Sequence, residues 1–371
     1  MSKVKLGDVA IEYKETCKGS KDGYPIVGLE HLVPEEVTLT AWDEGSDNTF
    51  TKMFRKGNVL FGRRRAYLKK AAVAPFDGIC SGDITVIEAI PDRILPELLP
   101  FIIQNDELFD FAVGKSAGSL SPRVKWEHLK NYEFELPDMG KQRELAELLW
   151  AMDATKKSYQ KLIAATDELV KSQFIEMFGN PMTNDKHWPT KKMKDVAPSS
   201  PYTGEIIQNT NGYWLLNLDM VESNSGRIIE KVYVAEDEIG QSTTTFSSKY
   251  VLYSKLRPYL NKVVVPDDDG YATTELIPLL PNQQLLTQLY LAQLLRGDEF
   301  LAYISSQVSG TKMPRVTMNV FWDFDVMLPP LYLQERYAAF VRQSDKSKFE
   351  LEQALSELTA TYKRIIAENL G

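Results

Sequence analysis

Three short motifs in the sequence contain residues that elsewhere bind nucleotides or take part in catalysis, and each lacks the rest of its motif. Gly114-Lys115-Ser116 resembles the end of a phosphate-binding loop, but Phe109 stands where that loop needs a glycine. Asn180-Pro181-Met182 resembles part of a methyltransferase loop, but the chain has no Gly-x-Gly cofactor loop. Pro91-Asp92 has no acid-x-lysine pair at the spacing of a nuclease site. The sequence therefore predicts no catalytic centre in this chain.

Cysteine and histidine are too few and too scattered to predict a disulfide framework or a zinc site. The chain of 371 residues has 2 cysteines and 3 histidines, and none of them cluster. No apolar run reaches the length of a signal peptide core or a membrane span. We therefore expect a cytoplasmic protein with no metal or cofactor of its own.

The positive charge of the chain is concentrated in two stretches, although the net charge is −8. Residues 49–76 contain no carboxylate but eight lysines and arginines, and residues 239–266 contain no carboxylate but four. Aromatic residues such as Phe61 and Tyr67 lie among the basic ones. A basic run is usually only a solvated surface, but local charge without nearby acids, interleaved with aromatics, favours binding to nucleic acid.

Two loops rich in small residues and hydroxyls, at 115–119 and 309–312, precede Arg123 and Arg315 and suit close approach to phosphates as well as any exposed loop. The predicted DNA contacts combine these loops with the basic stretches. They are Arg63, Arg64, Arg65, Lys69, Lys70, Lys115, Ser116, Arg123, Lys255, Arg257, Lys262, Thr311, Lys312 and Arg315.

The chain contains two copies of one unit at a constant offset of 192 residues. Arg65-Ala66-Tyr67-Leu68 recurs as Arg257-Pro258-Tyr259-Leu260, and Pro-Arg-Val occurs at 122–124 and 314–316. Two readers of different half-sites should share what binds the DNA backbone and differ in what reads bases. Arg65 and Arg257 are therefore predicted to contact phosphates or support the fold, and the unshared Arg64 is predicted to contact a base.

Each copy is predicted to be a mixed α/β globule followed by one long helix. The predicted domains are globules at 1–141 and 192–333, long helices at 142–179 and 334–371, and a linker at 180–191. Shorter helical segments are expected at 95–111 and 285–304. The two long helices share a four-three apolar repeat, so we expect an antiparallel two-helix coiled coil that separates two globules related by a pseudo-twofold axis. The residues predicted to carry this spacer and subunit assembly are Tyr159, Ile163, Leu351, Leu355, Leu358 and Tyr362.

The whole pattern resembles the specificity subunit of type I restriction-modification systems. The resemblance rests on the duplication, on Pro-Arg-Val and Leu-Pro before each long helix, on the helix starts at Gln142-Arg143-Glu144 and Gln334-Glu335-Arg336, and on the segment 171–179. It implies two target recognition domains that each read half of a split double-stranded DNA site. It also implies two modification (methyltransferase) subunits on the spacer, with restriction (translocase and nuclease) subunits joined through them. S-adenosylmethionine, ATP and Mg would then belong to those partners.

A second interpretation remains open, in which the chain is a protein-only scaffold and its basic stretches are incidental. A DNA-sequence reader should lose affinity steeply as salt rises while keeping a preference for one sequence, and a scaffold should do neither.

Overall fold

A computed structural model of the protein describes residues 2–45, 48–118, 120–310 and 312–370, which form two compact units. Unit 1 consists of Met1–Leu162 and Leu351–Gly371, and unit 2 consists of Ile163–Glu350. Each unit therefore contains one α/β body and a part of both long helices. The prediction of a mixed α/β chain built from two repeated domains is confirmed.

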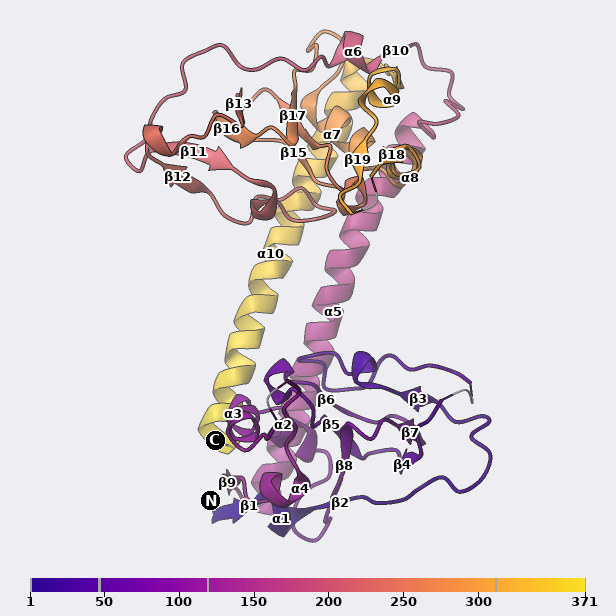
Figure 1. Ribbon diagram of the computed structural model, residues 1–371, viewed down its shortest axis with the longest axis vertical. Helices are drawn as coiled ribbons and strands as arrows, with labels where there is room; N and C mark the ends of the chain where they lie inside the picture. The colour runs from indigo at the N-terminus through magenta and orange to yellow at the C-terminus, as the bar shows by residue number, and fades with distance from the viewer. Residues whose placement is uncertain (1, 46–47, 119, 311, 371) are drawn as a thin grey trace. The chain divides into compact units, whose positions relative to one another are not determined.

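Unit 1 holds its strands in three small sheets (Figure 1). The sheet orders are β2-β8-β5-β6 and β3-β7-β4, and β1 pairs antiparallel with β9. The strands are β1 (Ser2–Lys5), β2 (Ala10–Glu12), β3 (Ile26–Val27), β4 (Lys52–Phe54), β5 (Val59–Gly62), β6 (Ala71–Val73), β7 (Gly78–Cys80), β8 (Ile84–Ala89) and β9 (Glu133–Leu136). The helices of its body are α1 (Leu6–Val9), η1 (Leu29–His31), η2 (Ala66–Leu68), α2 (Leu99–Ile103), α3 (Asp106–Gly114) and α4 (Trp126–Leu129).

Unit 2 repeats this plan and adds a short hairpin, β18-β19. Its larger sheets have the orders β12-β11-β16-β13 and β15-β14-β17, and β10 pairs with β20. The strands are β10 (Thr190–Lys192), β11 (Tyr213–Leu216), β12 (Val232–Val234), β13 (Thr243–Phe246), β14 (Val251–Ser254), β15 (Val263–Val264), β16 (Gly270–Thr273), β17 (Leu276–Leu279), β18 (Val308–Ser309), β19 (Arg315–Val316) and β20 (Asp325–Met327). The helices are α6 (Met193–Val196), η3 (Leu218–Met220), η4 (Glu236–Glu238), η5 (Pro258–Leu260), α7 (Gln288–Arg296), α8 (Asp298–Ser305) and α9 (Met318–Trp322).

The two long helices, α5 (Met139–Phe178) and α10 (Leu331–Leu370), each begin three residues before the predicted start. A buried glutamine ties the first turn of each helix to its own unit. Gln142 accepts a hydrogen bond from the backbone N–H of Leu95 and donates to the carbonyl of Pro137, both at 2.8 Å. Gln334 makes the equivalent bonds to Thr287 and Pro329, at the same offset of 192.

Burial along the long helices follows the predicted apolar seam. Leu145, Leu149 and Val170 of α5 are buried, as are Tyr337 and Val341 of α10. The residues predicted for the spacer are all half-buried, namely Tyr159, Ile163, Leu351, Leu355, Leu358 and Tyr362. Half-burial is what a pair of helices provides, because a second helix covers only one side of a seam. These side chains therefore lie on the seam rather than on a fully exposed face.

Within each unit the start of one long helix packs near the end of the other. In unit 2, the Tyr337 hydroxyl donates to the carbonyl of Val170 at 3.0 Å, and its ring lies 5.6 and 5.4 Å from the rings of Phe174 and Phe178. In unit 1, Leu149 and Ile366 belong to the same core cluster. The residue contacts in both units are those of antiparallel helices.

The two shorter helical segments expected at 95–111 and 285–304 are each split into two helices. In unit 1, Asn105 ends the first piece and caps the second, because its side chain accepts a hydrogen bond from the Glu107 N–H at 3.1 Å. In unit 2 the break falls at Gly297, between α7 and α8. A local capping residue thus overrides an apolar pattern that continues through it.

Candidate nucleic-acid interface

The most basic predicted segment forms the same unusual turn in both units, which we call the arginine turn (63–70 in unit 1 and 255–262 in unit 2). It follows β5 or β14 and contains η2 or η5. Arg65 and Lys69 have left-handed backbone conformations, with φ of 54° and 51°. Arg257 and Asn261 at the same offset have φ of 50° and 48°. A left-handed conformation costs a residue with a side chain roughly 1–3 kcal/mol, so a turn that repeats it twice per copy is held by its surroundings.

Backbone hydrogen bonds from the Pro-Arg-Val segment hold each arginine turn in place. The N–H of Arg65 donates to the carbonyl of Pro122 at 2.8 Å, and the N–H of Arg257 donates to Pro314 at 2.7 Å. The next bond in each copy runs from the valine of Pro-Arg-Val to the first residue of the turn, at 3.0 Å in unit 1 and 2.9 Å in unit 2. Pro-Arg-Val therefore braces the turn, which explains why it recurs.

The arginine of Pro-Arg-Val is paired with a carboxylate in both units. Arg123 donates to both oxygens of Asp83, at 2.7 and 3.2 Å, and these bonds lower the pKa of Asp83 below its ordinary value. Arg315 lies 3.0 Å from Glu275, which stands 192 residues after Asp83. Arg123 and Arg315 thus make ion pairs that stabilise the fold of their own unit. Sequence reasoning missed the two acids, although their shared offset could have revealed them.

Arg64, the predicted base reader, is also engaged within unit 1. Its Nε donates to the Ser121 hydroxyl at 2.5 Å, and its Nη1 lies 3.5 Å from the Asp83 carboxylate. These contacts occupy Nε and Nη1, and among the described residues Nη2 has no partner.

Three of the predicted lysines are held by acceptors of their own unit. Lys70 donates to the carbonyl of Leu29 at 2.7 Å, and Lys262 donates to that of Leu218 at 2.6 Å. Lys69 lies 2.5 Å from a carboxylate oxygen of Asp106. Lys70 and Lys262 therefore tie the arginine turn to the 3-10 helices η1 and η3.

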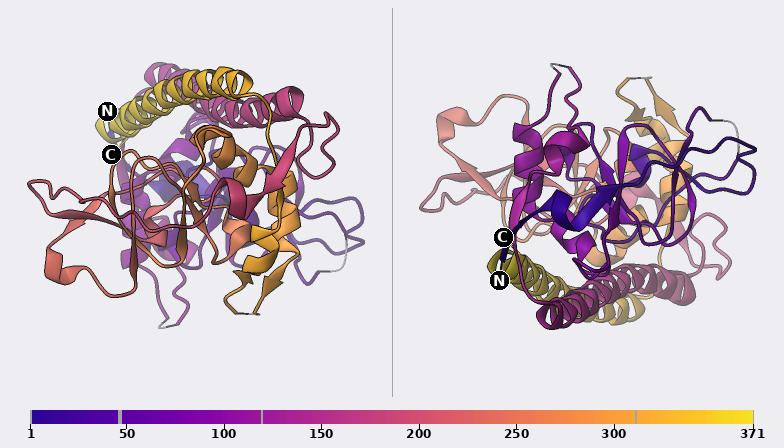
Figure 2. Two further views of the ribbon diagram at one scale, coloured as in Figure 1. Left: turned by 90° about the horizontal axis from the view of Figure 1, so that it is seen from above. Right: turned by 90° about the horizontal axis from the view of Figure 1, so that it is seen from below.

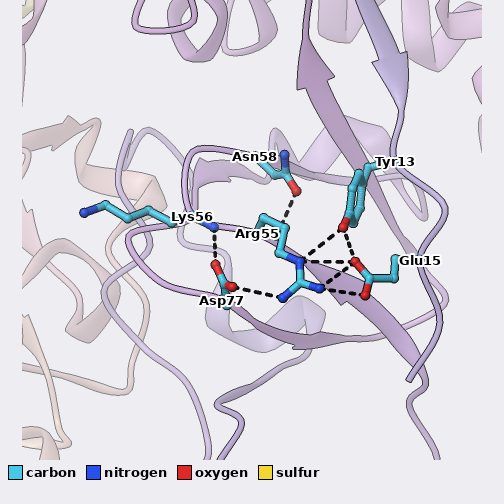
Figure 3. Close-up of polar contacts among 6 residues, drawn as sticks. All are labelled: Tyr13, Glu15, Arg55, Lys56, Asn58 and Asp77. Carbon is cyan, nitrogen blue, oxygen red and sulfur yellow. Dashed lines mark hydrogen bonds and ion pairs between the residues drawn. The ribbon is translucent and has the colours of Figure 1, made fainter. Parts of the chain in front are cut away.

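Arg55, which contributes to the same basic stretch, sits in a closed polar network within unit 1 (Figure 3). Its guanidinium donates to both oxygens of Glu15, the shortest bond being 2.6 Å, and to Asp77 at 3.0 Å. Tyr13 accepts from Arg55 at 3.2 Å and donates to Glu15. The pKa of Glu15 is lowered by its hydrogen bonds from Tyr13 and Arg55. Arg55 is therefore neutralised by acids that lie outside the stretch in sequence.

Once these pairs are made, each arginine turn, in the part of the chain that is described, still presents one exposed arginine without a partner and one exposed aromatic ring. Among the residues that the structure describes, the side chains of Arg65 and Arg257 have no hydrogen-bond or ion-pair partner, and both are exposed. Tyr67 and Tyr259, two residues later, are each 54% exposed. An exposed guanidinium can bind a phosphate, and an exposed ring in the same turn can stack on a base or sugar.

The remaining predicted residues differ in how free they are. Lys115 is exposed, and its Nζ lies 5.6 Å from the centre of the Phe111 ring. The Ser116 hydroxyl, just after the end of helix α3, donates to the carbonyl of Ala112 at 2.8 Å. Lys255 is half-buried and Lys312 is exposed. The Nε of Arg63 is buried without a hydrogen-bond partner. Thr311 lies outside the described residues.

Glu30 and His31, which are neighbours in the sequence, lie close to Asp43 in unit 1. The Nδ1 of His31 accepts from the N–H of Gly28 at 2.9 Å, and its Nε2 lies 3.6 Å from Asp43. His31 therefore has a structural role at the start of η1, where its ring accepts the N–H of Gly28.

No described helix is both long and apolar enough to cross a membrane.

Comparisons with known proteins agree on one family. The family model for the type I restriction modification DNA specificity domain matches residues 1–165 and 185–359. The EcoDI specificity subunit of a type I restriction enzyme from Escherichia coli is 25% identical over 152 residues, which span 40% of this chain and 34% of that relative. The match thus covers about a third of the relative's length.

Two solved structures have the same fold over nearly the whole chain. One, from work on complex assembly and conformational transition of the type I R-M system, matches with a TM-score of 0.57 at 20% identity, covering 99% of this chain and 97% of that chain. The other is the S subunit of a type I restriction-modification system from M. genitalium, with a TM-score of 0.57 at 13% identity, covering 98% and 94%.

Proposed function

Because the chain belongs to the type I restriction modification DNA specificity family, we propose that it reads an asymmetric, split site in double-stranded DNA, one half-site with each unit. The observation that carries this proposal is the pair of arginine turns. Each presents an exposed arginine without a partner of its own and an exposed tyrosine, on a backbone whose left-handed conformation costs folding energy.

The proposed role is recognition and assembly without catalysis. The chain would bring DNA to two modification (methyltransferase) subunits carried by α5 and α10, with restriction subunits joined through them. S-adenosylmethionine, ATP and Mg would be bound by those partners. The half-buried seam of the long helices supports this role, because it leaves the outward polar faces of both helices for other subunits.

The decisive experiment is selection from a random duplex pool with the full-length chain, followed by salt-titrated binding of the selected site. We expect a motif of two half-sites separated by unspecified bases. We also expect affinity to fall steeply with salt, since each phosphate contact contributes about one to the slope of log K against log salt. Weak binding without any enriched sequence would support the protein-only scaffold instead.

Paired variants test the arginine turns directly. Arg65→Ala and Arg257→Ala should each weaken binding to specific and random DNA alike and lower the salt slope by about one. Arg143→Ala and Arg342→Ala are matched controls, because both arginines are exposed but lie on the long helices. Equal effects from turn and control variants would contradict the proposed interface.

A further inference from the structure

A hairpin is hydrogen-bonded to each arginine turn, and its end exposes a large apolar side chain. The described residues of this tip hairpin are 115–118 and 120–123 in unit 1, and 308–310 and 312–316, with β18 and β19, in unit 2. Leu120 in the first is 91% exposed, and Met313 in the second is 47% exposed. Figure 2 shows that each hairpin, purple in unit 1 and orange in unit 2, projects from the body of its own unit.

The ends that carry these side chains are braced on both sides. In unit 1, Ala117 and Arg123 exchange two backbone hydrogen bonds of 3.0 Å, and Arg64 holds the Ser121 hydroxyl directly after Leu120. In unit 2, Ser309 pairs with Arg315, and Pro314 directly after Met313 accepts the bond from Arg257. The apolar side chains are therefore displayed on anchored hairpins.

Exposure of a single apolar residue is ordinary and carries no inference alone. Leu120 and Met313 differ from other exposed apolar residues, such as Ile11 in β2, by what surrounds them in the fold. Both lie on hairpins hydrogen-bonded to the turn that presents the unpaired arginine, and an exposed lysine accompanies each, Lys115 or Lys312. The positive charge of the arginine and the lysine would attract a nucleic acid and bring it against the apolar tip.

The two hairpins also differ where readers of different sequences should differ. Their braces, Pro-Arg-Val and the paired arginine, are the same at offset 192. Their tips differ, because Leu120 and Ser121 of unit 1 correspond to Lys312 and Met313 of unit 2 at this offset. Residues that position DNA should be shared by the two units, and residues that specify its sequence should differ. The shared braces and the differing tips match this expectation.

We propose that Leu120 and Met313 are specificity-determining residues that make apolar contact with bases, one in each half-site, and that Arg64 positions the Leu120 tip. Leucine and methionine contact bases either at a thymine methyl in the major groove or as a wedge between base steps. This inference rests on the proposed DNA-reading function. It assigns base reading in unit 1 to an apolar side chain, with the arginine beside it as its support.

The test repeats the selection from random duplex DNA with the full-length Leu120→Ala and Met313→Ala variants. Each should lose preference at one or two adjacent positions of one half-site and keep the other half-site intact. The affinity ratio of specific to random DNA should fall about 5- to 30-fold, with random DNA bound as before. Ile11→Ala and Ile229→Ala are the controls, since both side chains are exposed outside the hairpins, and both should select the original site.

Arg64→Ala should reproduce the loss seen with Leu120→Ala, and the double variant should add little, because both act through one tip. Selection of the original motif by Leu120→Ala, or an equal loss of affinity for specific and random DNA, would overturn this inference. Failure of the unaltered protein to enrich any sequence would overturn the proposed function itself.

Discussion

At the scale of single residues, Arg65 combines a functional side chain with an unfavourable backbone conformation. Its φ of 54° suits glycine better than any residue with a Cβ. We therefore expect Arg65→Gly to be more stable to urea than Arg65→Ala by about 1 kcal/mol, although both lack the guanidinium. At an ordinary position such as Arg93 the order of the two variants should be reversed. Equal stability of the Gly and Ala variants would show that the turn carries no such cost.

Asp83 is the acid on which the brace of unit 1 depends, and its contribution should depend on pH. Arg123 lowers the pKa of Asp83, so the ionised carboxylate stabilises the folded state above the ordinary carboxyl pKa of about 4 and loses this effect as pH falls further. Wild type should exceed Asp83→Asn in unfolding free energy at pH 7, by about 1 kcal/mol given partial exposure of the pair.

The gap between wild type and Asp83→Asn should close as urea denaturation is repeated at pH values falling from 5 to about 3. Asp92→Asn, at an exposed position outside the brace, should match wild type in unfolding free energy at both the highest and the lowest pH. A gap for Asp83→Asn that stays constant over this range would contradict an ionic origin.

At the scale of elements, the buried glutamine at the start of each long helix joins the helix to its α/β body. Replacing Gln142 with Met leaves the buried Pro137 carbonyl and the half-buried Leu95 N–H without their partner. Each unsatisfied group costs about 1–3 kcal/mol, so Gln142→Met should lower the unfolding free energy by about 2–4 kcal/mol. Gln160→Met, at an exposed position of the same helix, should change it little. Urea denaturation measures both, and equal values would contradict this role.

The same scale shows what the sequence could predict and what it could not. The seam of α5 and α10 was predictable, because a helix repeats its apolar face at a fixed period. The charge state of residues 49–76 was not, because the acids that neutralise Arg55 are Glu15 and Asp77, which approach only after the strands pair. A carboxylate-free stretch of sequence is therefore a poor measure of free positive charge on a surface.

At the scale of the whole molecule, the offset of 192 residues predicted the repeated fold because it links features of several kinds. It relates the arginine turns, the Pro-Arg-Val arginines with their carboxylate partners, and the glutamines of the long helices. It could not predict the capped breaks at Asn105 and Gly297, since these depend on local hydrogen bonds within an apolar pattern that runs through them.

The spacer length is predicted to set the gap between the two half-sites. Removing one heptad from each long helix keeps the seam in register and shortens both helices by about 10 Å at 1.5 Å per residue. The selected DNA site should then keep both half-sequences with a gap about three base pairs shorter. Removing a heptad from α5 alone should instead disturb the pairing of the helices. An unchanged gap in the double deletion would contradict the prediction that the long helices set the spacing of the half-sites.

The left-handed arginine turn also has a consequence for how such chains diverge. Asn261 stands where its counterpart is Lys69, and asparagine tolerates this conformation better than lysine does. Neutral drift at positions 65 and 257 should therefore run toward glycine or asparagine wherever DNA reading is no longer under selection. A relative that has kept only its role in assembly should be recognisable by that exchange alone, before any binding experiment is made.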